Sequence, residues 1–451
     1  MAESLIIWLP EESDGPNERH RYVAHIAFEV ILGCPYQWAK DETEWQHSKL
    51  RKIQYGGTSA ACGEDSAIWI PSSGLLGLKG TQVPKWKWSD AATSATPGGS
   101  RLPFGVMHRG HEGSICDWWS WLFWMVTRLE EHELSVQERD RFGRIEGKKT
   151  WVYQEGWLER PEVECRVLAW AKYHEVGHSV GTYQVIPTID VDSAFAYKHR
   201  SLFMTLAAAA QDLFKGRMHR FSERIRVLSG RQFDPYETYD WLESQHQNAG
   251  MVAIYFFLLA DRGEYDRGIF WKSAGLQKQI RELRSQAKVG IHPGVASHDA
   301  LGLDTMKREM ARLKHIIDEP VTRSRQHYLL QNPGNSWRRL QSLGIKEDHS
   351  LGFADVPGFR AGMSRAFPAY DLKEEAIMNL ELHPIAAMDA TFMRYLKVSP
   401  DEAVEHVVKI ASSVREVGGV LRLLWHNESV SDTGSWTGWR MMYQQMLQRV
   451  R

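Results

Sequence analysis

The chain has 451 residues, which is enough to bury a large apolar interior and predicts two domains. Its 55 lysine and arginine residues nearly balance 56 aspartate and glutamate residues, so the formal net charge is −1 at pH 7. This balance excludes a global field that attracts nucleic acid or an anionic membrane. We therefore expect no nucleic-acid partner.

Cysteine usage and apolar runs bear on the location of the protein. The four cysteines form no C-x-x-C pair and indicate reduced thiols: Cys34, Cys62, Cys116 and Cys165. The first ten residues have no basic segment and too short an apolar run for a signal peptide. The strongest apolar run, residues 251–260, is about half the length needed to cross a bilayer. We expect a soluble, cytoplasmic protein without a membrane span.

The first third of the chain has the patterns of a small α/β domain. Residues 4–9 and 66–71 are short apolar runs that predict strands, and residues 21–32 have the spacing of an amphipathic helix. Residues 89–100 are poor in apolar side chains and predict a surface loop. Residues 118–131 resume helical spacing with a dense group of tryptophans. Although tryptophan rings suit sugar faces, we expect most of the 19 tryptophans to fill the core or an interface.

A domain boundary is predicted near residue 165, with an accessory domain at 1–165 and a larger domain at 166–451. Predicted strands and helices then alternate, which is typical of parallel strands joined by helical crossovers. The strands are expected at residues 183–189, 252–259 and 289–291 and near His327, and the helices at 201–214, 274–287 and 304–317.

The last unit has the clearest pattern. Ser399 and Pro400 supply a cap and a first helical residue, and valines follow at helical spacing until Gly418 and Gly419 end the helix. Residues 420–425 then form an apolar run that predicts a buried strand.

Two acidic residues close the first strand of the larger domain, as Asp190-Val-Asp192. Side chains two positions apart in a strand point to the same side, so both carboxylates should share one volume. Their repulsion is relieved if one of them takes up a proton readily, as a general base does, or if a cation binds the pair. The alternative is that one aspartate caps the next helix.

Histidines follow later strands at the same edge. His292 follows an apolar run and precedes Pro293, which ends the strand. A third ligand from a separate strand is what an open catalytic zinc site requires, and His327 meets this requirement better than His298. The alternative is that each histidine is structural.

Further candidates lie near the C-terminus. His426 and Glu428 share a face by strand alternation, so the carboxylate could orient the imidazole of a general acid; a structural histidine is the alternative. Asp355 and Arg360 lie in a segment rich in glycine and proline that could hold a polar substrate or form a structural turn.

These motifs resemble a bacterial branch of the polysaccharide deacetylase family in their order and spacing. The resemblance rests on Thr188-Ile-Asp-Val-Asp-Ser-Ala-Phe-Ala-Tyr-Lys198, Gly290-Ile-His-Pro293, Ser324-Arg-Gln-His327, Gly352-Phe-Ala-Asp-Val-Pro-Gly-Phe-Arg-Ala-Gly362 and Leu424-Trp-His-Asn-Glu-Ser429. The first 160 residues also resemble the N-terminal domain of unknown function found in this branch, through Leu5-Ile-Ile-Trp-Leu-Pro10, Lys52-Ile-Gln-Tyr55 and Trp124-Met-Val-Thr-Arg-Leu-Glu-Glu131.

The resemblance implies a deformed (β/α)7, TIM-like barrel with a smaller N-terminal α/β domain. It also implies one bound divalent metal, usually zinc in this family, and hydrolysis of acetyl groups on sugars. At the matching positions, Asp190 is expected to be the general base, His426 the general acid, and Asp192 and His292 metal ligands.

Two departures from better-known members affect the site. Val191 separates two aspartates that are adjacent in those members, and the second histidine of their H-x-x-x-H stretch has no counterpart here. We assign the third ligand to His327, with His298 as the alternative, and the orienting arginine to Arg325 or Arg360.

The sequence thus predicts a metal-dependent hydrolase that removes acetyl groups from an amino sugar or a polysaccharide precursor. One alternative is a hydrolase of a glycosidic or another C–N bond on the same scaffold, which would bind metal without releasing acetate. The other is a non-catalytic protein that binds a glycan. The oligomeric state is left open.

Overall fold

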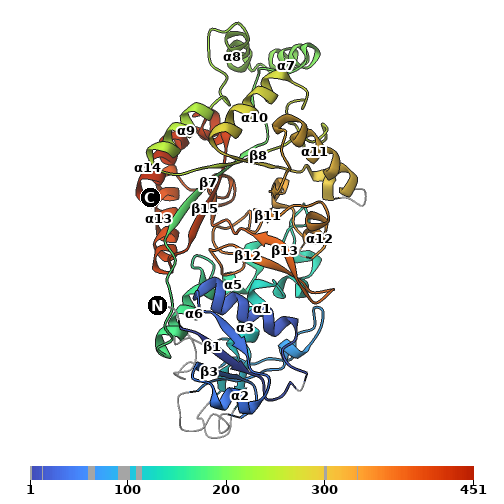
Figure 1. Cartoon of the computed structure of the whole chain (residues 1–451). Helices are drawn as coiled ribbons and strands as arrows, with labels where there is room; N and C mark the ends of the chain where they lie inside the picture. The colour runs from blue at the N-terminus through green and yellow to red at the C-terminus, as the bar shows by residue number, and fades with distance from the viewer. Residues whose placement is uncertain are drawn as a thin grey trace.

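The computed structural model describes residues 3–12, 14–58, 67–89, 102–107, 114–298, 302–332 and 334–451. Figure 1 shows an elongated molecule with a small N-terminal sheet at one end, a larger sheet in the middle and two helices, α7 and α8, at the other end. Cys62, Ser66 and all but Ser89 of the loop predicted at residues 89–100 lie outside the described residues.

The small sheet has four parallel strands in the order β2-β1-β3-β4. The side chains of Leu5, Ile6 and Ile7 on the inner strand β1 are fully buried, as expected for a parallel strand with both faces covered. The elements here are β1 (Leu5–Trp8), α1 (Glu18–Ala24), a π-helical continuation (His25–Ile31), β2 (Tyr36–Trp38), α2 (Glu42–His47), β3 (Arg51–Tyr55) and β4 (Ile68–Ile70). The strands and the helix predicted in this region are confirmed.

The tryptophan-rich segment forms α3 (Trp118–Val126), and all nine of its residues are buried. Trp119 stacks on Tyr55 with ring centroids 4.8 Å apart, and Trp118 lies 5.0 Å from Trp170. These rings therefore belong to the core. The neighbouring elements are the antiparallel pair β5 (Gly105–Met107) and β6 (Ser114–Cys116), and the helices α4 (Glu130–Glu133), α5 (Trp151–Gln154) and α6 (Glu162–Tyr173).

The large sheet has nine strands in the order β12-β13-β11-β10-β9-β8-β7-β15-β14. All neighbouring pairs are parallel except β12 with β13. The strands are β7 (Gln184–Val191), β8 (Ile254–Phe257), β9 (Lys288–Ile291), β10 (Arg323–Ser324), β11 (Glu347–Asp348), β12 (Phe367–Asp371), β13 (Ala376–Leu382), β14 (Ala387–Met388) and β15 (Val420–His426).

The strand pairs show an α/β sheet but do not close it into a barrel. Among the described residues, β12 and β14 stand at the two ends of the strand order and no pairing joins them. Strands β10, β11 and β14 contain only two residues each, so their ladders are short. The α/β class is confirmed, and the closed seven-stranded barrel stays a prediction.

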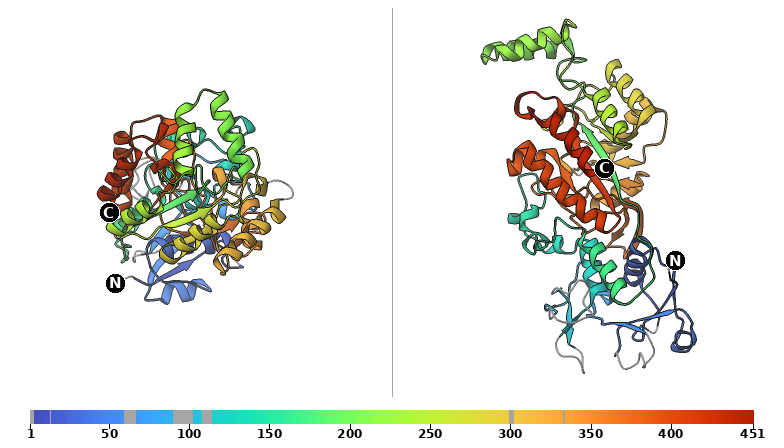
Figure 2. Two further views of the ribbon diagram at one scale, coloured as in Figure 1. Left: turned by 90° about the horizontal axis from the view of Figure 1, so that it is seen from above. Right: turned by 90° about the vertical axis from the view of Figure 1, so that its left-hand side faces the viewer.

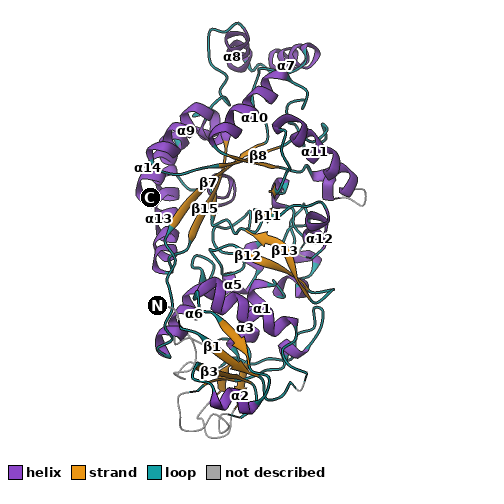
Figure 3. Ribbon diagram, in the orientation of Figure 1, coloured by secondary structure: helices purple, strands orange, loops and turns teal. Residues whose placement is uncertain are grey.

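Helices form the crossovers between these strands, as Figure 3 shows. They are α7 (Leu202–Phe214), α8 (Met218–Leu228), α9 (Tyr239–Asn248), α10 (Ala274–Gln286), α11 (Gly302–Ile317), α12 (Asn335–Ser342) and α13 (Pro400–Glu416). The C-terminal helix α14 (Trp439–Val450) follows the last strand. The four helices expected from the sequence here are α7, α10, α11 and α13; α8, α9, α12 and α14 were not predicted. No described helix is both long enough and apolar enough to cross a membrane.

The N-terminal part packs closely against the large sheet. One continuous cluster of buried apolar residues contains side chains from both parts. The Tyr22 hydroxyl donates to the Pro368 carbonyl oxygen at 2.7 Å, and Arg360 forms a buried ion pair with Glu131. Residue 165 lies inside α6, so that helix runs through the predicted boundary. The division into two domains stays a prediction.

Candidate metal centre

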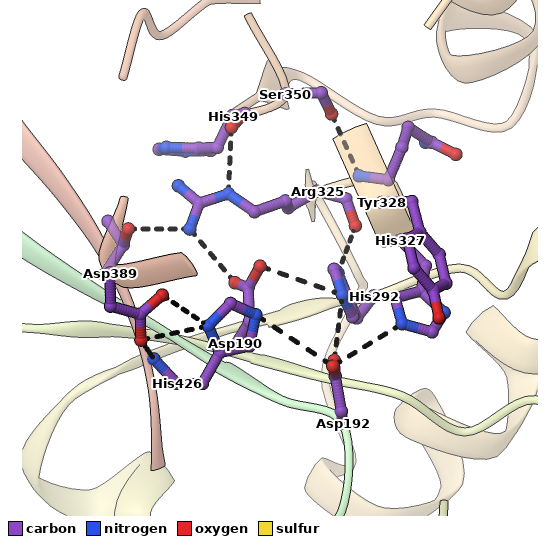
Figure 4. A network of polar contacts seen from close by, with 12 residues as sticks. Asp190, Asp192, His292, Arg325, His327, Tyr328, His349, Ser350, Asp389 and His426 are labelled. Carbon is purple, nitrogen blue, oxygen red and sulfur yellow. Dashed lines mark hydrogen bonds and ion pairs between the residues drawn. The ribbon is translucent and has the colours of Figure 1, made fainter. Parts of the chain in front are cut away.

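Strand β7 delivers two carboxylates to one edge of the large sheet. β7 lies between β15 and β8, and Asp190 is in register with His426 on one side and Phe256 on the other. Asp192 follows the last residue of the strand. Figure 4 shows both carboxylates facing three histidines: His426 in β15, and His292 and His327, which follow β9 and β10. The shared volume predicted from strand alternation is therefore present.

Asp192, His292 and His327 form a compact group of possible metal ligands. One ligand atom from each lies within 4.8 Å of the other two. His292 Nε2 is 3.3 Å from Asp192 Oδ1, and His327 Nε2 is 3.5 Å from Asp192 Oδ2. His298 is not a member of this group among the described residues. The geometry favours His327 over His298 as the third ligand.

The chemistry of these residues fits a divalent cation. Asp192 Oδ1 is buried and accepts no hydrogen bond of good geometry from the described residues, although His292 Nε2 lies 3.3 Å away; a cation between the two would satisfy both atoms. Burial raises the pKa of Asp192, but the imidazoles of His327, His292 and His426 outweigh burial and hold it well below its usual range. Burial lowers the pKa of His327, yet Asp192 and Asp266 raise it to about 9. The cluster therefore attracts positive charge.

Both candidate histidine ligands are oriented through their second ring nitrogen. His292 Nδ1 lies 2.6 Å from the backbone oxygen of Arg325, and His327 Nδ1 lies 2.8 Å from Asp266 Oδ1. Each contact leaves Nε2 facing Asp192. Such contacts fix ring orientation and leave the other nitrogen as the acceptor that a metal requires.

Asp190 is held by a buried arginine. Arg325 Nη1 donates to Asp190 Oδ1 at 3.0 Å and to Thr188 Oγ1 at 2.7 Å. Arg325 Nε donates to the His349 carbonyl oxygen at 2.9 Å, so the guanidinium is anchored on two strands. A buried guanidinium that donates to the carboxylate fixes the direction in which the carboxylate points. Of the two arginines expected from the sequence, Arg325 contacts Asp190, whereas Arg360 contacts Glu131.

His426 is held by a carboxylate that the sequence analysis missed. The Nδ1 atom of His426 lies 2.9 Å from Asp389 Oδ1, and the His426 backbone N–H donates to Asp389 Oδ2 at 2.8 Å. His426 Nε2 faces Asp192 Oδ2 at 3.9 Å. Burial lowers the pKa of His426, but Asp389, Asp192 and Asp190 raise it to about 10. His426 therefore carries a proton at neutral pH.

These side chains line one cavity of about 280 Å³. Glu428 also lines it, lies 3.5 Å from Arg394, and has a pKa that burial and Asp192 raise. Arg144 reaches the cavity wall from the N-terminal part, donating to the Tyr328 carbonyl oxygen at 2.7 Å and to the Tyr395 hydroxyl at 2.8 Å. Both parts of the chain thus shape the cavity.

Two of the residues predicted to orient the substrate do not reach the cavity. Asp355 accepts hydrogen bonds from the backbone N–H groups of Gly147 and Lys148, and Arg360 is paired with Glu131 at 2.7 Å. Neither lines the cavity. The expectation that they hold substrate is corrected by these contacts, because both residues fasten the N-terminal part to the sheet. The alternative of a structural turn is the better description of their segment.

Asp266 and Asp389 are the functional candidates that sequence reasoning missed. Asp389 follows β14, a strand of two residues, and Asp266 lies in the loop between β8 and α10. Neither has a local motif that marks it. Only the fact that Asp389 also follows a strand at the same edge of the sheet could have indicated it.

Comparisons with known proteins give a partial match. Residues 9–173 match the model of a family of unknown function, DUF7033. This is the region for which the sequence resembles an N-terminal domain of unknown function. No curated protein matches the chain.

Solved structures match part of the chain with low scores. A structure named as a polysaccharide deacetylase from Mycobacterium smegmatis is 14% identical, covers 60% of this chain and 85% of its own, and has a TM-score of 0.39. Another structure so named, from Pseudomonas aeruginosa PAO1, is 11% identical, with 59% and 83% covered and a TM-score of 0.36. Puue allantoinase has the same identity, coverage and TM-score as the second.

Proposed function

We propose that this protein is a metal-dependent hydrolase that removes acetyl groups from an amino sugar or a polysaccharide precursor. One observation carries the proposal. The possible metal ligands Asp192, His292 and His327 share a cavity with two separately held titratable groups, Asp190 and His426. This is the set of groups that hydrolysis of an amide or ester needs: a cation site, a base and an acid.

The ligand set favours zinc. Two imidazole nitrogens and one carboxylate oxygen are typical of catalytic zinc sites that keep one position open. A zinc ion held there would polarise an acetyl carbonyl oxygen and lower the pKa of a water molecule.

Asp190 is suited to accept the proton of the attacking water. Arg325 and Thr188 share a network with Asp190 Oδ1, while Asp190 Oδ2 lies 3.7 Å from His292 Nε2 and is turned toward the ligand group. Arg325 thus acts as a positioning residue that keeps the carboxylate turned toward the ligand group.

His426 is suited to protonate the leaving group. It is charged at neutral pH, and Asp389 holds Nδ1, so the proton on Nε2 is directed toward the cavity. Donation from Nε2 would convert a departing amine or alkoxide into a neutral product. The acid and the base lie on adjacent parallel strands, β15 and β7, which holds them at a constant separation.

The cavity wall suits a carbohydrate. Tyr265, Tyr328 and Tyr395 line it and offer flat rings with a polar edge, which pack well against sugar rings. Its volume of about 280 Å³ is near the lower end for ligand sites, so we expect it to hold one sugar unit and its acetyl group.

Location of the protein in the cytoplasm stays a prediction.

The test begins with metal content, measured by mass spectrometry on protein purified without a metal-affinity tag. We expect near-stoichiometric metal in the wild type and loss of most of it in Asp192→Ala and His327→Ala. His298→Ala is the matched control. His298 lies in the segment that follows the ligand His292 but outside the ligand group, so this variant should retain the metal.

The second step is an acetate-release screen with acetylated amino sugars. Wild type should release acetate, and Asp190→Asn should bind metal but release acetate at least ~100-fold more slowly, because the general base is lost. If the protein binds metal and hydrolyses another C–N bond or a glycosidic bond without releasing acetate, the acetylated substrate in the proposal is wrong and the hydrolase acts on that other bond. Wild type that takes up no metal even after zinc is added back would refute it and favour a non-catalytic glycan-binding protein.

A further inference from the structure

Helices α7 and α8 form a hairpin that projects from the molecule at the end opposite the N-terminal sheet, as Figures 1 and 2 show. The outward face of α7 is apolar. Phe203, Leu206 and Phe214 are 81%, 61% and 93% exposed, and Leu202 and Leu213 are exposed beside them. A surface helix of a globular protein normally turns its apolar stripe toward the core, so this arrangement is inverted.

The exposed apolar side chains of the described residues are concentrated on this hairpin. About half of the large ones lie within residues 202–233: Leu202, Phe203, Leu206, Leu213, Phe214, Met218, Ile225, Leu228 and Phe233. Scattered exposed apolar residues need no explanation, but a concentration on one projecting element indicates a docking surface.

The exposed charges on the hairpin are positive, and its negative charges are buried. Residues 201–233 contain six basic and two acidic residues, a net charge of +4 in a chain whose total is −1. Both acidic residues are buried and bonded: Asp212 pairs with Arg224 at 2.7 Å, and Glu223 accepts from the Tyr197 hydroxyl. Within this fully described range, every exposed acidic or basic side chain is basic: Lys215, Arg217, Arg220 and Arg231.

We propose that the α7–α8 hairpin docks on an anionic lipid bilayer, with the apolar face of α7 in the headgroup layer and the basic residues at its rim. Apolar side chains flanked by lysine and arginine are the two features that bind helices to anionic membrane surfaces. A second copy of the chain is a poorer occupant, because pairing two hairpins would bring two faces of charge +4 together. At 13 residues, α7 lies on the bilayer rather than crossing it.

The hairpin is separated from the candidate metal site by the loop between β8 and α10. A second cavity of about 510 Å³ separates the start of α7 from the loop between β8 and α10, and His199, Met204, Ile269 and Phe270 help to line it. Tyr265 in the same loop lines the cavity of the candidate metal site, and Phe270 is 66% exposed. The loop between β8 and α10 therefore borders both the base of the hairpin and the candidate site.

The test is flotation of the full-length protein with lipid vesicles, which requires no substrate and does not depend on the proposed chemistry. We expect binding to vesicles of phosphatidylcholine mixed with phosphatidylglycerol, weak binding to phosphatidylcholine alone, and release by added salt. The double variant Phe203→Ser/Phe214→Ser should partition at least ~10-fold less, because each ring contributes apolar area to the bound state.

Two further variants separate charge from apolar contact. Lys215→Glu/Arg217→Glu should lower binding to the anionic vesicles while leaving the melting temperature unchanged, because both side chains are exposed. Met441→Ser is the matched control: Met441 is 65% exposed on α14, outside the hairpin, and its removal should leave binding unchanged.

The outcomes decide the proposal. Wild type that stays unbound with anionic vesicles would overturn it. A dimer, seen by analytical ultracentrifugation without vesicle binding and lost in Phe203→Ser/Phe214→Ser, would also overturn it and assign the surface to a second copy. Equal loss of vesicle binding in Met441→Ser and in the hairpin variants would show that the hairpin is not the docking surface.

Discussion

The proposed general acid His426 is held by Asp389, a residue outside the ligand group of Asp192, His292 and His327. Asp389 is fully buried and uses both carboxylate oxygens on His426, one on the ring nitrogen and one on the backbone N–H. It thereby fixes the ring and stabilises the imidazolium, as carboxylates do for catalytic histidines. At the scale of single residues, Asp389 is the positioning residue on which the proposed acid depends.

Replacing Asp389 with asparagine tests this role. We expect kcat for the hydrolysed substrate to fall by about 10²–10⁴-fold, with little change in KM or in metal content, because substrate and ligand contacts remain. Steady-state kinetics and metal analysis measure the two quantities. Glu243→Gln is the control, since Glu243 also holds a buried histidine, His246, but lines neither cavity described above. A similar fall of kcat in both variants would indicate a general structural effect.

At the scale of elements, the N-terminal boundary of α13 is determined by its local sequence. The Ser399 hydroxyl accepts from the Glu402 backbone N–H, and the Glu402 side chain accepts from the Ser399 backbone N–H, which is a complete capping box. Pro400 follows at the first helical position. The buried face of α13 packs on β15, the strand that carries His426.

Ser399→Ala should therefore lower the free energy of unfolding by about 1 kcal/mol, because an N-terminal backbone N–H loses its acceptor. Urea denaturation measures the change. Ser412→Ala in the exposed middle of the same helix is the control and should be neutral or slightly stabilising, because alanine has the higher helix propensity. Destabilisation of both variants to the same extent would argue against the cap.

At the scale of the whole molecule, one buried ion pair connects the N-terminal part to the large sheet. Arg360 donates through Nε and Nη2 to the two carboxylate oxygens of Glu131, at 2.7 Å each, and Arg128 donates to Glu131 Oε1 at 3.0 Å. Burial raises the pKa of Glu131, but Arg360 and Arg128 outweigh burial and lower it to about 2. The folded protein therefore holds this carboxylate ionised.

This pair makes stability depend on pH in a defined direction. Because the folded-state pKa is below the ordinary value of 4.5, the stabilisation is present above pH 4.5 and is lost as pH falls from 4.5 toward 2. Glu131→Gln should lower the free energy of unfolding at pH 7 by about 3–5 kcal/mol, because the buried guanidinium of Arg360 loses its charged partner and that of Arg128 keeps only Glu130. The difference from wild type should shrink as pH falls through this range.

Urea denaturation at a series of pH values measures both effects. Glu416→Gln is the matched control, because Glu416 faces Arg160 in an exposed pair at 3.7 Å and should cost less than about 1 kcal/mol at any pH. A Glu131→Gln variant as stable as wild type at pH 7 would contradict the assigned role of the pair.

Much of the candidate site could be predicted because its residues follow strands. Asp190, Asp192, His292 and His426 each end a recognisable apolar run, and parallel strands place such ends at one edge. Asp355 and Arg360 were misplaced because their partners, Gly147 and Glu131, lie more than 200 residues earlier in the chain. Asp266 and Asp389 were missed because they act only through histidines that the fold brings to them.

The sequence by itself determined the α/β fold class, the order of the main strands along the chain and the residue types at their ends. Those properties depend on local periodicity, capping and turn chemistry, which a single segment contains. The tertiary structure decided that His327 rather than His298 faces Asp192, that Asp389 holds His426, and that the apolar face of α7 is turned outward. These depend on contacts between segments distant in the chain, and the local sequence contains no record of which segment will be the partner.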